Sequence, residues 1–222
     1  AAPPMIVSVS PADNSLTNDK SASLVLTMSE NVKKGSGNIE IRDVTHSSQF
    51  ASIDVTSGNV SISDNVVTIT HADFGNATYA VRIANTCFED YAGNAFAGIN
   101  DDTTWNFEVD ATPPTIAALS PLDNAITNNK TANLVMTLSE SVMKGSGNIE
   151  IWDVTHSSQF ALIDVASTDV SINGSVVTIA HAAFGNTAYA VRIANTCFRD
   201  AANNAFAGIA DELPATIKTY ID

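Results

Sequence analysis

The residues of this chain that could do chemistry are four histidines, two cysteines and an excess of carboxylates. The histidines stand at His46, His71, His156 and His181, and none is part of an HxH, HExxH or His–Cys cluster. The chain therefore lacks the usual ligand spacings of a zinc or catalytic metal site. Asp43, His46 and Ser47 resemble a Ser-His-Asp set, but a triad also needs locked side chains and an oxyanion hole. We interpret this run as turn chemistry and predict that the chain is not an enzyme.

Cys87 and Cys197 are the only cysteines, and they hold the same position in two copies of a repeated sequence. A disulfide needs Cα atoms within about 7 Å, whereas equivalent points of successive domains lie much farther apart. We therefore predict two unpaired cysteines that act as small buried hydrophobes beside Phe88 and Phe198. A disulfide between two molecules is the alternative.

The net charge of −14, from 24 acidic and 10 basic residues, excludes one class of partner. Nucleic-acid phosphates would be repelled, and no basic stripe is present to release their counterions. Two interpretations of the acidity stay open. It is a solvated surface that keeps the protein soluble, or part of it binds Ca²⁺, a cation that prefers oxygen ligands.

An internal repeat organises the chain. The segment 79–88, YAVRIANTCF, recurs unchanged at 189–198, and the KGSGNIEI of residues 34–41 recurs at 144–151. The spacing of 110 residues predicts two domains, 1–110 and 111–222, each of ordinary sandwich size. Pro113-Pro114 lies at the junction, where it ends one sheet and limits the swing of the next domain. The start at Ala1 without Met suggests a mature product or an excised fragment.

Apolar residues in each copy alternate with period two, as in half-buried strands. In copy one the predicted strands cover residues 24–28, 38–42, 67–70, 79–83 and 105–109. Turn signals separate them, among them Pro11 to Asn14 and Gly35 to Gly37. Short helical turns are predicted over 71–76 and 85–90. The pattern predicts an all-β fold of two tandem Ig-like β-sandwich domains.

Copy two departs from copy one near its end. Residues 200–204 lack the glycine of the first copy, and Trp105 and Phe107 are replaced by Ala215 and Ile217. The pattern therefore defines the last strand of copy two less well than any other.

The frame Ser10-Pro11-x-Asp13, Lys34-Gly35-x-Gly37-Asn38-Ile39, Phe88-Glu89-Asp90-x-Ala92-Gly93-Asn94 and Trp105-x-Phe107 resembles the Ig-like repeat of bacterial S-layer proteins and giant surface adhesins. The resemblance covers nearly all of both copies. It implies an extracellular or cell-surface location, with neighbouring Ig-like repeats of a longer array as partners. It also implies Ca²⁺, since related adhesins depend on calcium.

A sandwich that the chain enters at one end and leaves at the other gathers acidic loops at its ends. The candidate Ca²⁺ ligands are the acids of these loops and of the junction: Glu30, Asp90, Asp101, Asp110, Glu140, Asp200 and Asp211. Clustered carboxylates repel one another unless a cation lies among them, so calcium would stiffen the junction. In the alternative, Asp90 and Asn94 hydrogen-bond within their own turn and the other acids are solvated.

The predicted function is a non-catalytic extracellular structural or adhesion module, a spacer repeat of a bacterial surface or secreted protein. No apolar run is long enough for a membrane helix, so membrane insertion is not expected. One alternative is a carbohydrate- or surface-binding module, accessory to a secreted enzyme or adhesin, that contacts a surface glycan or another cell-surface protein. Trp152, predicted to face outward, could stack on a sugar ring there, or pack on a neighbouring strand. Another alternative is homotypic adhesion between arrays.

Overall fold

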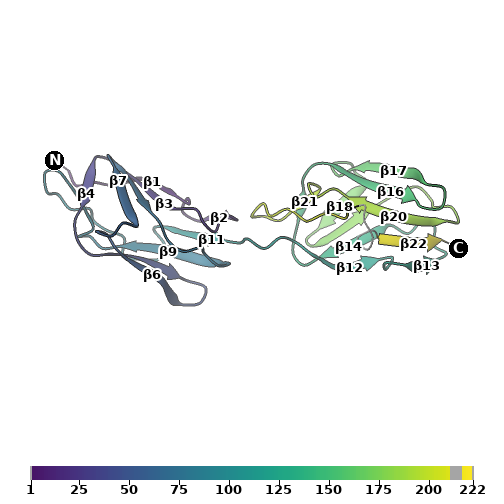
Figure 1. Ribbon diagram of the computed structural model, residues 1–222, viewed down its shortest axis with the longest axis horizontal. Helices are drawn as coiled ribbons and strands as arrows, with labels where there is room; N and C mark the ends of the chain where they lie inside the picture. The colour runs from purple at the N-terminus through teal and green to yellow at the C-terminus, as the bar shows by residue number, and fades with distance from the viewer. Residues whose placement is uncertain (1, 211–216, 222) are drawn as a thin grey trace. The chain divides into compact units, whose positions relative to one another are not determined.

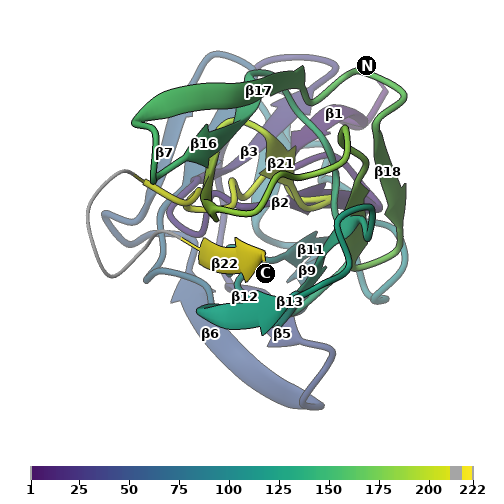
Figure 2. The same cartoon turned by 90° about the vertical axis from the view of Figure 1, so that its right-hand side faces the viewer.

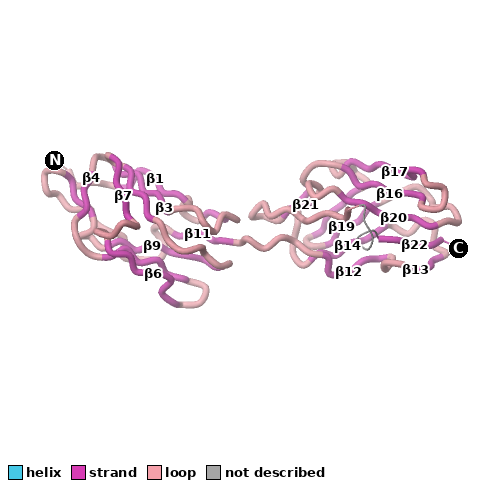
Figure 3. Tube along the Cα trace, in the orientation of Figure 1, coloured by secondary structure: helices cyan, strands magenta, loops and turns pink. Residues whose placement is uncertain are grey.

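The computed structural model describes residues 2–210 and 217–221, and the side chains as far as residue 210. The chain forms two compact units, Ala1–Ala111 and Thr112–Asp222, and each is described by itself. All described residues lie in strands, turns or loops (Figure 3). No described segment is therefore a helix long and apolar enough to span a membrane. The predicted all-β class is confirmed.

The described residues of unit 1 form eleven strands, several of which are labelled in Figure 1. They are β1 (Ile6–Ser10), β2 (Ser15–Thr17), β3 (Leu24–Met28), β4 (Val32–Lys34), β5 (Asn38–Asp43), β6 (Ser48–Asp54), β7 (Val60–Ser63), β8 (Val66–Ile69), β9 (Ala77–Ile83), β10 (Phe88–Asp90) and β11 (Asn106–Val109). Every strand that the alternation predicts is present, as β3, β5, β8, β9 and β11. The alternation is visible in β3, where Leu24, Leu26 and Met28 are fully buried and the residues between them are half-buried.

The two predicted helical turns are wrong. Residues 71–76 form an irregular loop, and the segment 85–90 is a turn followed by strand β10. In β10 the buried side chains of Phe88 and Asp90 flank the half-buried Glu89, so the burial repeats every two residues. The strand pairs antiparallel with β4, a partner more than fifty residues away in the sequence. Local pattern alone did not reveal that partner.

The strands of unit 1 form two main sheets, in the orders β1-β3-β8-β7 and β2-β11-β9-β5-β6, with a small β10-β4 pair beside them. The sheets enclose one core, in which Leu26 of the first sheet and Ile41 of the second are both fully buried. The chain passes from the first sheet to the second through the predicted turn at Pro11, which follows a cis peptide bond. Strand β2 then pairs parallel with β11.

The chain enters and leaves unit 1 at opposite ends. At the first end the backbone amide of Ser29 donates to the carbonyl oxygen of Met5. At the other end the amide of Asp110 donates to the carbonyl oxygen of Thr17, and Val109 pairs with Ala77. In Figure 1 the N-terminus and the end of β11 lie at opposite ends of the unit. A pull on the two ends of the unit would therefore act along the length of its strands.

Unit 2 repeats this plan with its own core. Its strands are β12 (Ile116–Ser120), β13 (Ala125–Thr127), β14 (Leu134–Leu138), β15 (Met143–Lys144), β16 (Asn148–Asp153), β17 (Ser158–Asp164), β18 (Val170–Asn173), β19 (Val176–Ile179), β20 (Ala188–Ile193), β21 (Phe198–Arg199) and β22 (Ile217–Ile221). Figure 2 shows β16 and β17 side by side at one edge of the larger sheet.

The last strand of unit 2 is present, but its register differs from that of unit 1. A spacing of 110 residues aligns Ile217 with Phe107. In the sheet, however, Ile217 pairs with Val191. The equivalent of Val191 in unit 1 is Val81, and the residue opposite Val81 is Trp105. The backbone of β22 is therefore displaced by two residues relative to β11. The residues preceding it, 211–216, lie outside the described part of the chain.

Candidate functional site

The histidine, aspartate and serine that resemble a catalytic set form a turn, as predicted. Asp43 accepts a hydrogen bond from the backbone amide of His46 at 2.9 Å, and its second oxygen lies 2.8 Å from His46 Nδ1. Desolvation, the largest single influence, raises the pKa of Asp43. The bonds to His46 together outweigh it, so that the pKa is lowered. Within the described residues Ser47 makes no hydrogen bond to the imidazole, and the His46 side chain is 65% exposed. Asp153 and His156 repeat the arrangement in unit 2.

The other two histidines have a structural role. His71 Nδ1 lies 2.7 Å from the carbonyl oxygen of Ala72, and Nε2 lies 3.0 Å from that of Ala22. The ring packs against Phe74 at a centroid distance of 4.0 Å. His181 makes the equivalent contacts in unit 2. Because backbone carbonyls engage both ring nitrogens, neither nitrogen is directed toward a metal ion.

The two cysteines are unpaired and fully buried, which confirms that they serve as core residues. The thiol of Cys87 lies 3.4 Å from the carbonyl oxygen of Asn38, and Cys197 lies equally far from that of Asn148. Burial raises the pKa of both thiols. A nucleophilic cysteine needs the opposite environment, one that stabilises the thiolate.

Asp90 and Asp200 are buried, with 2% of each residue exposed, and each organises its own turn. One Asp90 oxygen accepts hydrogen bonds from the amides of Ala92 and Asn94 at 2.8 Å, and the other accepts one from Asn94 Nδ2 at 2.7 Å. The Asn94 side chain is the main cause of a lowered Asp90 pKa. Asp200 binds Asn204 in the same way. The alternative in which Asp90 and Asn94 hydrogen-bond within their own turn is thus observed.

Asp101 is engaged within its own turn. Its carboxylate accepts hydrogen bonds from the backbone amides and hydroxyl groups of Thr103 and Thr104, at 2.8 to 2.9 Å. These four bonds, led by the Thr103 amide, lower its pKa to about 2. The neighbouring Asp102 forms a bidentate ion pair with Arg82, at 2.7 and 2.9 Å. Both acids therefore already have their own hydrogen-bond donors in unit 1.

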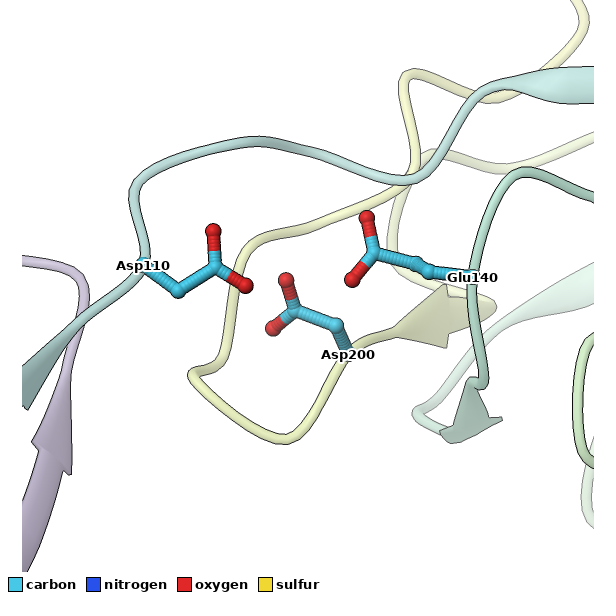
Figure 4. Close-up of side chains that lie close together, drawn as sticks. All are labelled: Asp110, Glu140 and Asp200. Atoms are coloured by element: carbon cyan, nitrogen blue, oxygen red, sulfur yellow. The ribbon is translucent and has the colours of Figure 1, made fainter. Parts of the chain in front are cut away.

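Glu140 and Asp200 are the two predicted calcium ligands that unit 2 brings together. Their carboxylate oxygens lie within 4.8 Å of each other, one from the loop after β14 and one from the turn after β21 (Figure 4). Asp110, also labelled there, belongs to unit 1, where it accepts a hydrogen bond from Asn76 Nδ2 at 2.7 Å. Glu30 is the half-buried equivalent of Glu140 in unit 1. Asp211 lies outside the described residues.

Trp152 lies on β16 and is half-buried. The guanidinium carbon of Arg192, on the neighbouring strand β20, lies 5.0 Å from the centre of its ring. One face of the indole is therefore covered by a cation–π contact. Trp152 packs on a neighbouring strand, the second of the two roles considered for it.

An open groove that no sequence motif marks lies on the outer face of the larger sheet in each unit. In unit 1 its polar lining consists of Asn38, Glu40, Arg82, Asn85 and Asn100. Asn148, Glu150, Arg192 and Asn195 line the described part of the groove in unit 2. The one sequence signal that could have revealed it is that four polar residues recur at equivalent positions of both copies.

Comparison with known proteins places this geometry in context. A family model described as a bacterial Ig-like domain matches residues 1–109 and 110–214. No curated protein matches the chain. Among solved structures, the chain is similar to Drosophila OTK, extracellular domains 3-5, at 8% sequence identity and a TM-score of 0.25. That alignment covers 99% of this chain and 64% of the other, and a likeness this weak carries no functional argument.

Proposed function

The chain belongs to the bacterial Ig-like domain family, and from this premise we propose that it is a non-catalytic extracellular spacer, a repeated structural module of a bacterial surface or secreted protein. Its partners in this role are neighbouring repeats of the same kind. A spacer has to carry force along the chain and to fold without help from the next domain. Both requirements can be examined in the structure of each unit by itself.

The observation that carries this proposal is the threading of unit 1. The chain enters near Met5 and leaves near Asp110, at opposite ends of a sandwich that buries its own core. Unit 2 has a separate core of its own. Each added repeat with these properties lengthens the protein, and each can unfold while its neighbour stays folded.

Single-molecule force spectroscopy on the whole chain tests the spacer role. We expect two separate unfolding events, each lengthening the chain by on the order of 300 Å, because roughly 100 residues extend at about 3.5 Å each. A single event that releases both units at once would contradict the proposal. The low-force extension of the folded chain, measured in the same experiment, gives the reach per repeat.

The non-catalytic part of the proposal is supported by the roles of the reactive side chains. Among the described residues both ring nitrogens of His71 are engaged by backbone carbonyls, and Cys87 is buried. Neither side chain is therefore placed to act as a nucleophile or as its general base. Broad hydrolase screens on the purified chain are expected to be blank, and saturable turnover that is lost in a His46→Ala variant would overturn this part.

We also propose that calcium stiffens the module. Glu140 and Asp200 fit a Ca²⁺ ion, because both offer only oxygen ligands and their oxygens lie within 4.8 Å. Their mutual repulsion would be relieved by a bound cation. Asp101 fits such a site less well, since its carboxylate accepts four hydrogen bonds, whereas Asn204 donates two to Asp200. Participation of Asp110 from the junction stays a prediction.

Thermal unfolding with millimolar Ca²⁺ or with EGTA tests this calcium site. Ca²⁺ is expected to raise the melting temperature of unit 2 by several degrees, because a ligand at about 100 times its Kd stabilises the folded state by about 2.7 kcal/mol. Glu140→Gln should abolish the shift, and Glu108→Gln, an exposed change on β11, should leave it intact. An unchanged melting temperature would remove the calcium proposal and leave the spacer role untouched.

A further inference from the structure

The groove on the larger sheet of each unit has the features of a binding site that the spacer role does not require. In unit 1 its volume is about 590 Å³, and it lies where Asn38 and Glu40 of β5 face Arg82 of β9. Its other wall comes from the segment 97–100. We propose that this groove binds a neutral saccharide chain.

The wall formed by residues 97–100 is held rigidly. Ile99 and Ile83 exchange two backbone hydrogen bonds of 2.8 Å. Gly98 has a φ of +80°, and a Cβ atom there would lie 2.6 Å from the carbonyl oxygen of Ile83. Only glycine permits this close approach without strain. The groove is therefore formed before any ligand arrives, which lowers the entropic cost of binding.

Several polar side chains of the groove have donor and acceptor atoms that make no hydrogen bond to a described residue. Asn38, Asn85 and Asn100 are exposed, and their side-chain amides make no hydrogen bond to any described residue. Arg82, in contrast, is fixed by its bidentate pair with Asp102. Three free amides and one immobilised guanidinium group thus line the groove.

This combination matches the hydroxyl groups of a sugar. Each amide offers both donors and an acceptor, Glu40 accepts and Arg82 donates, and a sugar hydroxyl can do both. The exposed methyl groups of Ala84 and Ala97 lie in the same lining and suit the apolar face of a pyranose ring. Such a mixture of a small apolar surface with a few convergent polar groups is typical of small-ligand sites.

Charge favours a neutral glycan over an anionic one. The single cation of the unit 1 lining, Arg82, is paired with Asp102, and Glu40 adds a negative charge beside it. The whole chain carries a net charge of −14, which repels polyanions. An uncharged polysaccharide meets no such penalty.

The second unit repeats most of this lining, with Ala210 in place of Asn100. Its groove of about 570 Å³ includes Asn148, Glu150 and Asn195, and Gly208 has a φ of +81°. Two weak sites on one chain, multiplied along an array of repeats, give strong binding to a polymer through avidity. The single-site affinity is therefore expected to be low, with a Kd on the order of 1 mM.

Amide-resolved NMR titration of the whole chain tests the proposal. The probes are four neutral hexasaccharides (maltohexaose, cellohexaose, laminarihexaose and mannohexaose) and an anionic oligogalacturonate. At least one neutral probe is expected to cause saturable shifts in the side-chain amide signals of Asn38, Asn85 and Asn100. The anionic probe should bind more weakly.

Variants locate the binding. Combining Glu40→Gln with Asn85→Ala should weaken binding in unit 1 at least tenfold, while the melting temperature stays that of the parent chain. Thr68→Ala on β8, in the opposite sheet, is the matched control and should bind as the parent does. The proposal is overturned by any of three results: no saturable shift with the four neutral probes, stronger binding of oligogalacturonate, or binding that leaves the side-chain amide signals of Asn38, Asn85 and Asn100 unmoved. None of these would change the two-step unfolding expected of a spacer.

Discussion

The indole Nε1 of Trp105 donates a hydrogen bond of 2.9 Å to the carbonyl oxygen of Pro11. The two residues are 94 positions apart, and the bond ties the start of the last strand to the point where the first strand changes sheets. Trp105 is fully buried and is the largest such side chain in the described structure. This contact therefore joins the N-terminal and C-terminal segments of unit 1.

Trp105→Phe is expected to destabilise unit 1 by about 2–3 kcal/mol, because it leaves a cavity and removes the hydrogen bond to the Pro11 carbonyl group. Chemical unfolding of the whole chain, monitored by circular dichroism, should show the transition of unit 1 at a lower denaturant concentration. The transition of unit 2 should not move. Tyr91→Phe serves as the control, since Tyr91 is 75% exposed. Equal loss of stability in both units would contradict the assignment.

Asp101 should make the stability of unit 1 depend on acid pH. Its hydrogen bonds to Thr103 and Thr104 lower its pKa from 3.8 to about 2. A carboxyl group with a lowered folded-state pKa contributes stability above its unfolded pKa, and this contribution is lost as the pH falls from 3.8 toward 2. Asp101→Asn should therefore destabilise unit 1 at pH 7, and the difference from the parent chain should shrink by pH 2. Unfolding free energies measured across this range check it, with Asp64→Asn as the control. A constant difference would contradict the prediction.

Gly35 and Gly58 should respond oppositely to replacement by alanine. A Cβ atom on Gly35 would collide with the backbone carbonyl oxygen of Thr86, whereas nothing lies within 4 Å of a Cβ on Gly58. Gly35→Ala is expected to cost about 2–3 kcal/mol, because the turn must shift away from its hydrogen bond with Cys87. Gly58→Ala should be neutral or stabilise by about 0.4–1 kcal/mol through the unfolded chain. Melting temperatures of the two variants compare them directly, and similar values would be inconsistent with this packing.

Cys87 and Cys197 should be inert in the folded protein. Both are fully buried, and burial raises the pKa of both thiols, so little thiolate is exposed to a reagent at neutral pH. Labelling with a thiol reagent should be negligible before unfolding and should reach two thiols per chain in denaturant. Non-reducing electrophoresis should show monomers. Rapid labelling of the native chain, or a disulfide-linked dimer, would instead favour the intermolecular bridge.

Much of the fold could be predicted because its signals are local. Leu24, Leu26 and Met28 alternate with less buried residues, and this pattern needs only neighbouring positions to be recognised. The turn of Asp90 and Asn94 could be foreseen for the same reason, since its hydrogen bonds span four residues. Strand β10 was mistaken for a helical turn because its partner β4 lies far away in the sequence.

The sequence by itself determined the duplication, the all-β class and the turn roles of residues such as Asp43, because each depends on short-range patterns or on identity between the two copies. Only the tertiary structure decided which distant residues meet. It brings Asn38, Arg82 and Asn100 to one groove, pairs Glu140 with Asp200, and sets Ile217 opposite Val191. Strand pairing and loop packing fix such contacts through many residues at once, and no single segment carries that information.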